Sequence, residues 1–277
     1  MSRVSWKDLP VPVRRAVTER AGRVLSMDPA PRGAGSDLVA TLHTSGGRIF
    51  LKGSRLEGPR ADVRRIETRV QPFLPERAPR MLWHAEAAGW LLMAFEHVDG
   101  RHADLSPGSA DLGEVAALLA ELSHEARPDL PVLPVKRRWA PFAASAELDL
   151  LRGDILAHMD LNAGNILIGP RSWVVDWAWP SRAAAWLDTA SMVVRLIEAG
   201  HSPQGAERWA QQVPAWKQTT SEALRVYTGT RLALADSQGS ADLAVALRAW
   251  RAYLDTSPVA RPRSADPGPG SFGVHSV

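Results

Sequence analysis

The stretch HMDLNAGNILIGPRSWVVDWAWP, residues 158–180, decides the fold class of this chain. It places Asp160, Asn165 and Asp176 at fixed offsets, with the apolar run ILI after Asn165 and the run WVV before Asp176. The two apolar runs predict a short hairpin that brings the three polar side chains together. Asp and Asn are common turn residues when taken singly. The compound pattern HxDLxxxN, followed by two apolar residues and Asp, is far more specific.

Phosphoryl transfer needs one base that orients the attacking oxygen and two oxygen ligands that hold Mg²⁺ on the nucleotide phosphates. Asp160 is the predicted catalytic base, because its carboxylate can accept a hydrogen bond from a substrate hydroxyl and aim that hydroxyl at the γ-phosphate. Asn165 and Asp176 are the predicted metal ligands, through an amide oxygen and a carboxylate.

Composition places the chain among ordinary globular proteins. Of its 277 residues, 45% are hydrophobic and 23% are charged, which is enough to bury a sizeable core. The absence of cysteine excludes disulfides, thiolate nucleophiles and Cys-based zinc sites. The first 17 residues contain no signal-peptide-like apolar segment. No apolar run reaches the ~18 residues that span a bilayer. We therefore expect a cytoplasmic protein with no membrane partner.

The charge pattern does not indicate a nucleic-acid partner. The net charge is only +3, from 33 basic and 30 acidic residues. The basic residues are scattered, and the longest run is KRR at 136–138. Such a pattern is typical of a solvated surface.

Hydrophobic periodicity predicts a first third that is mostly β-structure with one inserted helix. The expected helices are residues 7–22, with Val11, Val13, Ala16 and Val17 towards the core, and residues 59–70. The expected strands are residues 23–27, 38–43, 48–52, 79–85 and 89–96.

From residue 109 the pattern becomes helical. The expected helices are residues 109–122, 183–199, 203–212, 218–235 and 241–254. We predict an N-terminal β-rich nucleotide-binding lobe at 1–96 and a helical catalytic and acceptor-binding lobe at 97–255. The segment 256–277 is rich in Pro, Gly and Ser, which predicts a disordered tail.

The segments HMDLNAGNIL and VVDW resemble the catalytic loop and metal-binding segment of the aminoglycoside phosphotransferase and choline-kinase-like family. That family usually has His-Gly-Asp, and here Met159 replaces the Gly. The resemblance implies an α+β, two-lobed protein-kinase-like fold with a small antiparallel-sheet N-lobe, one helix in it, and a larger, mainly helical C-lobe. It also implies ATP and Mg²⁺ as cofactors and a small-molecule hydroxyl as the acceptor.

The resemblance extends upstream to Lys52 and Glu67. Lys52 is similar to the strand lysine that reaches the α- and β-phosphates, and Glu67 to its ion-pair partner on the following helix. Taken alone, both residues would more simply be solvated surface groups. Glu57 is a competing partner, but it lies in a loop and is less well placed.

Further residues take roles only through the same resemblance. His158 and Asp188 are expected to support the catalytic loop, Asp188 by accepting its backbone N–H groups. Ser36, in the glycine-containing segment at 32–37, is expected to cover the phosphates. The hinge that binds adenine through its backbone is expected at Glu96, His97 and Val98.

The acceptor is less well defined than the nucleotide. A polycationic aminoglycoside would favour a surplus of acidic residues in the acceptor lobe. Residues 181–277 contain eight acidic and ten basic residues and show no such surplus. The chain contains eleven tryptophans, and packing is the expected role of most of them. Trp177 and Trp179 are left open between packing and an acceptor pocket.

Two other functions remain open on the sequence alone. A nucleotide-binding pseudokinase would fit the irregular glycine segment, although degenerate kinases usually lose one of Lys52, Asp160, Asn165 and Asp176. A protein kinase is disfavoured, because Asp188 follows Asp176 by only twelve positions, which leaves no room for a peptide-binding loop. The sequence does not define the oligomeric state.

Overall fold

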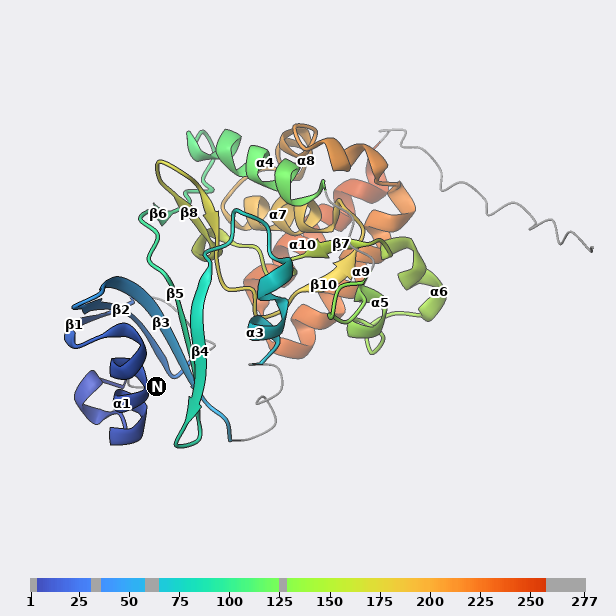
Figure 1. The fold of residues 1–277 in the computed structure, drawn as a ribbon. Helices are drawn as coiled ribbons and strands as arrows, with labels where there is room; N and C mark the ends of the chain where they lie inside the picture. Colours follow the sequence, from blue (N-terminus) through green and yellow to red (C-terminus); the bar gives the residue numbers. More distant parts are fainter. Residues whose placement is uncertain (1–3, 31–35, 58–64, 125–128, 258–277) are drawn as a thin grey trace, which may run out of the picture.

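The computed structural model describes residues 4–30, 36–57, 65–124, 129–257 of the chain. Its first part is a five-stranded antiparallel sheet in the order β1-β2-β3-β5-β4 (Figure 1). The strands are β1 Val24–Pro29, β2 Leu38–Thr44, β3 Gly47–Arg55, β4 Met81–Ala87 and β5 Trp90–Glu96. All five predicted strands of the first third are present, each with its bounds shifted by a few residues.

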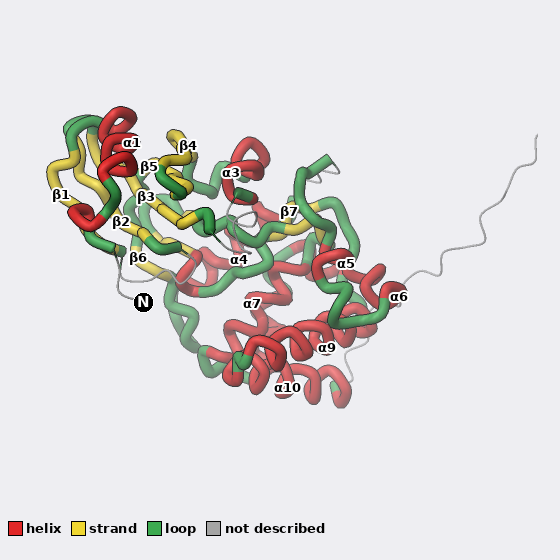
Figure 2. The backbone as a smooth tube through the Cα atoms, turned by 90° about the horizontal axis from the view of Figure 1, so that it is seen from below, coloured by secondary structure: helices red, strands yellow, loops and turns green. Residues whose placement is uncertain are grey.

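Alternation along the strands gives the sheet two different faces. In β3, Leu51 packs with β5 residues such as Leu92 against helix α1, Val11–Ala21. Lys52, the next residue, therefore points to the opposite face, where its ammonium lies 5.6 Å from the centroid of the Phe95 ring. That second face is turned towards the rest of the molecule (Figures 1 and 2).

Helix α1 is shorter than the predicted helix at residues 7–22. Leu9 precedes Pro10, and a residue before proline is driven to extended backbone, so the helix begins at Val11. Val13 and Val17 are buried as predicted. Val11 is 66% exposed, because a residue two positions before Val13 lies on the other side of the helix.

The inserted helix of the N-lobe is α3, Ile66–Val70. The predicted helix at 59–70 ends at the same residue, and its first part, residues 59–64, lies outside the described residues. Figure 1 shows α3 between the sheet and the helical part of the molecule.

The second part is mainly helical, with two small sheets. Its helices are α4 Asp111–Leu122, α5 Val135–Arg138, α6 Ser145–Leu148, α7 Leu187–Glu198, α8 Pro203–Ala210, α9 Ser221–Gln238 and α10 Ala241–Thr256. Strands β6 Arg101–His102, β8 Ile166–Ile168 and β9 Trp173–Val174 form one sheet, and β7 Ile155–Ala157 pairs with β10 Ser181–Ala183. The predicted hairpin of residues 166–175 is confirmed as β8 and β9.

The architecture confirms the predicted α+β fold with a small antiparallel-sheet lobe and a larger helical lobe. The exact division at residues 96 and 97 stays a prediction. Helix α10 runs to Thr256, one residue into the predicted tail, and residues 258–277 of that tail lie outside the described residues. No helix in the described ranges is both long and apolar enough to cross a membrane.

The larger lobe is built around a core rich in aromatic side chains. Tyr227 of α9 is in ring contact with three tryptophans from different segments: Trp139, Trp186 and Trp250. Packing is thus the role of most tryptophans, as predicted; the buried ones are Trp90, Trp139, Trp177, Trp186, Trp209, Trp216 and Trp250.

Candidate active site

The loop between β7 and β8 carries the predicted catalytic base. Asp160 follows β7 by three residues, and its side chain is 44% exposed. Its backbone carbonyl accepts hydrogen bonds from the side-chain amides of Asn162, at 2.9 Å, and Asn165, at 2.8 Å. Asn162 also accepts the N–H of Gly164 at 2.8 Å and so caps the short 3-10 helix of the loop. These hydrogen bonds fix the backbone conformation of the loop that contains Asp160 and Asn165.

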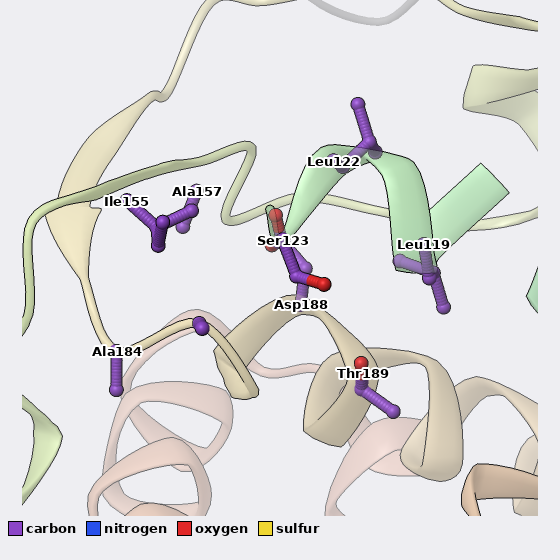
Figure 3. Close-up of a pocket in the computed structure, with 9 residues that line it drawn as sticks. Leu119, Leu122, Ser123, Ile155, Ala157, Ala184, Asp188 and Thr189 are labelled. Atoms are coloured by element: carbon purple, nitrogen blue, oxygen red, sulfur yellow. The ribbon is translucent and has the colours of Figure 1, made fainter. Parts of the chain in front are cut away.

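Asp188, in the first turn of α7, holds the start of this loop. Its carboxylate accepts the backbone N–H groups of His158, at 2.7 Å, and Met159, at 3.0 Å. Burial has the largest effect and raises the pKa of Asp188, and the two N–H bonds oppose that rise. In Figure 3, Asp188 points from α7 towards β7 and α4. The described residues around the small hollow there leave no room for a water molecule.

His158 links the loop to the segment that carries Asp176. The ring is fully buried, with Nε2 3.0 Å from the carbonyl oxygen of Val175 and Nδ1 3.3 Å from the N–H of Asp160. Nδ1 therefore accepts and Nε2 carries the proton that binds Val175. The rings of His158 and Trp177 pack edge to face, with their centroids 4.7 Å apart. His158 and Asp188 thus both contact the backbone around this loop, and their supporting role stays a prediction.

Lys52 joins the two lobes. Its ammonium donates to Glu67 at 2.7 Å and to Asp176 at 2.8 Å. Lys52 and Glu67 are buried, whereas the Asp176 side chain is 41% exposed. Burial alone would lower the pKa of Lys52, but the two carboxylates outweigh it and raise that pKa, so the ammonium stays charged. The predicted pairing of Lys52 with Glu67, and not with Glu57, is present, and the alternative of a solvated surface lysine does not apply.

Asn165 and Asp176, the two predicted metal ligands, come from neighbouring backbone segments. The backbone of Asn165 accepts the N–H of Val175 at 2.9 Å, which sets the two residues on adjacent backbones. Asn165 uses its amide nitrogen on Asp160, which leaves the amide oxygen for another ligand. Lys52, against burial, lowers the pKa of Asp176, so this carboxylate is ionised.

This donor set fits Mg²⁺ rather than an all-protein metal cage. No group of three or more His, Cys, Asp or Glu residues that could hold a metal exists in the described part of the chain. Mg²⁺ is usually held by one or two protein oxygens together with substrate phosphates and water. Asn165 and Asp176 would supply those two oxygens.

The remaining predicted nucleotide contacts are less defined. Ser36 is partly buried ahead of β2, and residues 32–35 of its segment lie outside the described residues. The carboxylate of Glu96 accepts the N–H of Arg80 at 2.9 Å, so its side chain supports the sheet. His97 and Val98 are partly buried directly after β5. The pKa of His97 is lowered, and burial is the largest cause. Contact of these residues with a nucleotide stays a prediction.

A pocket of about 880 Å³ opens beside Asp160 in the helical lobe. Residues that sequence reasoning did not select line it, among them Arg138, Arg195 and Arg231. Trp179 lines the same pocket and is 42% exposed, whereas Trp177 is buried in the core. Arg195 could have been found from its spacing, because it lies two helical turns after Asp188 on the same face of α7. Arg138 belongs to the KRR run that was interpreted as solvated surface, which is wrong for this residue.

No protein-family model and no curated protein matches the sequence. Solved structures do match. Choline kinase LicA from Streptococcus pneumoniae has a TM-score of 0.60 at 13% identity, over 87% of this chain and 98% of LicA. A thermostable mutant of aminoglycoside phosphotransferase APH(4)-Ia, in complex with ADP and hygromycin B, matches with a TM-score of 0.57 at 14% identity. The match covers 90% of this chain and 100% of the mutant enzyme. The aminoglycoside phosphotransferase from Alicyclobacillus acidocaldarius matches with a TM-score of 0.56 at 16% identity. The match covers 90% of this chain and 98% of that enzyme.

These similarities span both lobes and define a protein-kinase-like fold. Within that class, the chain shares the fold of choline kinase LicA and the aminoglycoside phosphotransferases, as the residues of the catalytic loop indicated. At 13–16% identity the similarity describes the fold and carries no acceptor over to this chain.

Proposed function

We propose that this protein transfers the γ-phosphate of ATP, with Mg²⁺, to a hydroxyl group of a small molecule. One observation carries the proposal: a chain of contacts crosses the two lobes. Asn165 donates to the backbone carbonyl of Asp160 and accepts the N–H of Val175, the residue before Asp176. Asp176 is in turn joined through the Lys52 ammonium to Glu67. The neighbouring structures support a nucleotide, since they include complexes with ADP, AMP-PNP and AMP.

Each residue of the network has a distinct role in the proposed reaction. Lys52, held by Glu67, would orient the α- and β-phosphates. Asn165 and Asp176 would hold Mg²⁺, whose charge neutralises the phosphates when it is bound. Asp160 would accept the hydrogen bond of the acceptor hydroxyl and direct its oxygen in line with the γ-phosphate.

The acceptor of this proposed reaction is a small molecule rather than a protein segment. Ser181–Ala183 of the segment between Asp176 and Asp188 forms β10 and pairs with β7. Ala183 and Trp186 in the same segment are buried. Those residues are therefore packed into the helical lobe and do not form an exposed surface on which a peptide could bind. The pocket beside Asp160 has the volume of a small-molecule site.

Asp160→Asn tests this proposal. The variant keeps the shape and the backbone bonds of the loop but loses the charge that attracts the hydroxyl proton. We expect turnover to fall by about 10²- to 10⁴-fold. Binding of the ATP analogue AMP-PNP, measured by calorimetry, should stay near wild type.

Asp154→Asn is the matched control, because Asp154 is exposed and lies 3.7 Å from Arg182, away from the network. It should keep wild-type turnover. Unchanged turnover in Asp160→Asn would refute the role of Asp160. Tight AMP-PNP binding with no phosphorylated product from any acceptor would instead support a nucleotide-binding protein without activity.

A further inference from the structure

The pocket beside Asp160 has three guanidinium groups in its wall. Arg138 comes from α5, Arg195 from α7 and Arg231 from α9. Three separate helices thus each contribute a cationic side chain to the wall of one pocket, which Asp160 also lines. Asp160 is the carboxylate that would receive the acceptor hydroxyl. The acidic residues in the wall are Asp160, Glu198 and Asp242.

Arg195 is the one of the three whose charge is already balanced. Its Nη1 donates to Glu198 at 2.7 Å, and its Nη2 lies 3.9 Å from a carboxylate oxygen of Asp160. Arg195 and Glu198 form an i,i+3 pair on the same helix. Glu198 is therefore engaged and does not offer a free charge to a cationic ligand.

Arg138 is held in place by neutral groups. Its Nε donates to the hydroxyl of Ser181 and its Nη2 to the carbonyl of Pro180 at 2.9 Å. The guanidinium also lies 5.7 Å from the centroid of the Trp179 ring. No carboxylate among the described residues forms an ion pair with it, and burial lowers the pKa of this group.

Arg231 is even less satisfied. Its guanidinium lies 5.9 Å from the centroid of the Trp139 ring. Its Nε is buried and has no hydrogen-bond acceptor among the described residues. A buried donor on a cation is costly when it has no partner, because the group has lost water and gained nothing in exchange. An anionic ligand in the pocket would supply that partner.

We propose that the acceptor is an alcohol that also carries an anionic group, a carboxylate or a phosphate, bound by Arg231 and Arg138 with its hydroxyl at Asp160. This inference rests on the proposed phosphoryl transfer and adds the substrate class. Planar guanidinium groups bind both kinds of anion in a bidentate manner. Asp242, the remaining acidic residue of the wall, is exposed at the start of α10. Neither arginine forms an ion pair with it or with another carboxylate in the part of the chain that the structure describes. A cationic acceptor would meet both arginines and be repelled.

A single sugar scaffold with different charges tests the proposal. The probes are D-glucuronate and D-glucose 6-phosphate as anions, D-glucuronamide as the neutral match and D-glucosamine as the cation. Choline and hygromycin B extend the cationic arm. Binding is measured by calorimetry without nucleotide, and product formation by phosphorus NMR with Mg-ATP. We expect at least one anion to bind about 10- to 100-fold more tightly than the amide and the cations, which is the usual strength of a charge-assisted pair.

Substitutions at Arg231 assign the effect to this residue. Arg231→Gln should remove the preference for the anion, Arg231→Lys should keep part of it, and Arg231→Glu should shift binding towards glucosamine. A gain of cation binding cannot come from misfolding. Arg248→Gln is the matched control, because Arg248 pairs with exposed Asp236 and does not line the pocket.

The outcomes separate this inference from the proposed function. Turnover or binding of glucosamine, choline or hygromycin B, with none of either anion, overturns the inference and leaves phosphoryl transfer intact. Binding of neither anion overturns it as well. Arg231-dependent binding of an anion with no transfer to any probe supports the anionic ligand and counts against the phosphotransferase.

Discussion

At the scale of single residues, two side chains of the site stand on strained backbone. Met159 has φ of 69° and Asp176 has φ of 66°, both in the left-handed region that favours glycine. Each costs about 1–2 kcal/mol relative to ordinary backbone. The Met159 side chain is buried and its N–H is held by Asp188, while Lys52 holds Asp176. The surrounding contacts therefore fix a geometry that the local chain disfavours, next to the residues proposed for chemistry.

The Lys52–Glu67 pair yields a prediction that separates stability from activity. Lys52→Met keeps the length of the side chain but leaves the buried Glu67 carboxylate without its cation, which should lower the free energy of unfolding by about 3 kcal/mol. Adding Glu67→Gln removes the uncompensated charge and should restore most of that loss. Turnover should stay low in both variants, because neither has an ammonium for the phosphates. Urea denaturation and a turnover assay measure the two effects.

A difference below about 0.5 kcal/mol between Lys52→Met and wild type would contradict this account of the pair. Recovery of turnover in the double variant would show that Lys52 does not act on the nucleotide.

At the scale of elements, hydrophobic periodicity was sufficient for long segments and insufficient for short ones. The strands of the first sheet and helices such as α7 repeat their apolar residues often enough to be recognised. Helices α5 and α6 have four residues each, and β7 and β10 have three each, so no period can be read from them. Their conformation depends on partners distant in sequence, such as β7 pairing with β10.

The start of α4 gives a prediction at this scale. Arg101 of β6 donates two hydrogen bonds of 2.6 Å to Asp111, the first residue of α4, and the N–H of Asp104 donates a third at 2.8 Å. These hydrogen bonds lower the pKa of Asp111 from its ordinary 3.8 to about 2, and those from Arg101 contribute more than the one from the Asp104 N–H. A carboxyl with a lowered pKa in the folded state stabilises the protein above pH 3.8, and this contribution is lost as the pH falls towards 2.

Asp111→Asn should therefore lower the free energy of unfolding by about 1 kcal/mol at pH 7, a value reduced because Arg101 is largely exposed. The difference from wild type should shrink as the pH falls from 4 to 3. Urea titrations at these pH values measure it. A difference that stays constant over this range would mean that the charge of Asp111 does not anchor α4.

At the scale of the whole molecule, residues within one short segment could be predicted from the sequence, and a pocket formed by several distant segments could not. Asp160, Asn165 and Asp176 lie within seventeen residues, so their pattern is visible in the chain. The pocket beside Asp160 takes Arg138, Arg195 and Arg231 from three helices that only the fold brings together. Each of these arginines resembles a surface residue until its neighbours are known. The loop that carries Asp160, Asn165 and Asp176 could therefore be predicted from the sequence, and the pocket beside it could not.

The contact between the lobes gives the last prediction. Lys52 of the sheet and Asp176 of the helical lobe meet at 2.8 Å, on the carboxylate proposed to bind Mg²⁺. Nucleotide and metal should thus stabilise the two lobes together. A saturating ligand adds about 2.7 kcal/mol at 100 times its Kd, which corresponds to a rise of about 5–10 °C in Tm for a chain of this size. We expect that rise with AMP-PNP and Mg²⁺, and a clearly smaller one with AMP-PNP and EDTA.

Asp176→Asn decides whether the metal acts through this residue. The amide can still accept a hydrogen bond from Lys52, so the lobes keep their contact, but it is a weaker ligand for a hard cation. In thermal scans, the variant should respond to AMP-PNP almost equally with Mg²⁺ and with EDTA, while Asp154→Asn should respond like wild type. A full Mg²⁺-dependent rise in Asp176→Asn would place the metal on other ligands, and Asp176 would then serve only to hold Lys52 between the lobes.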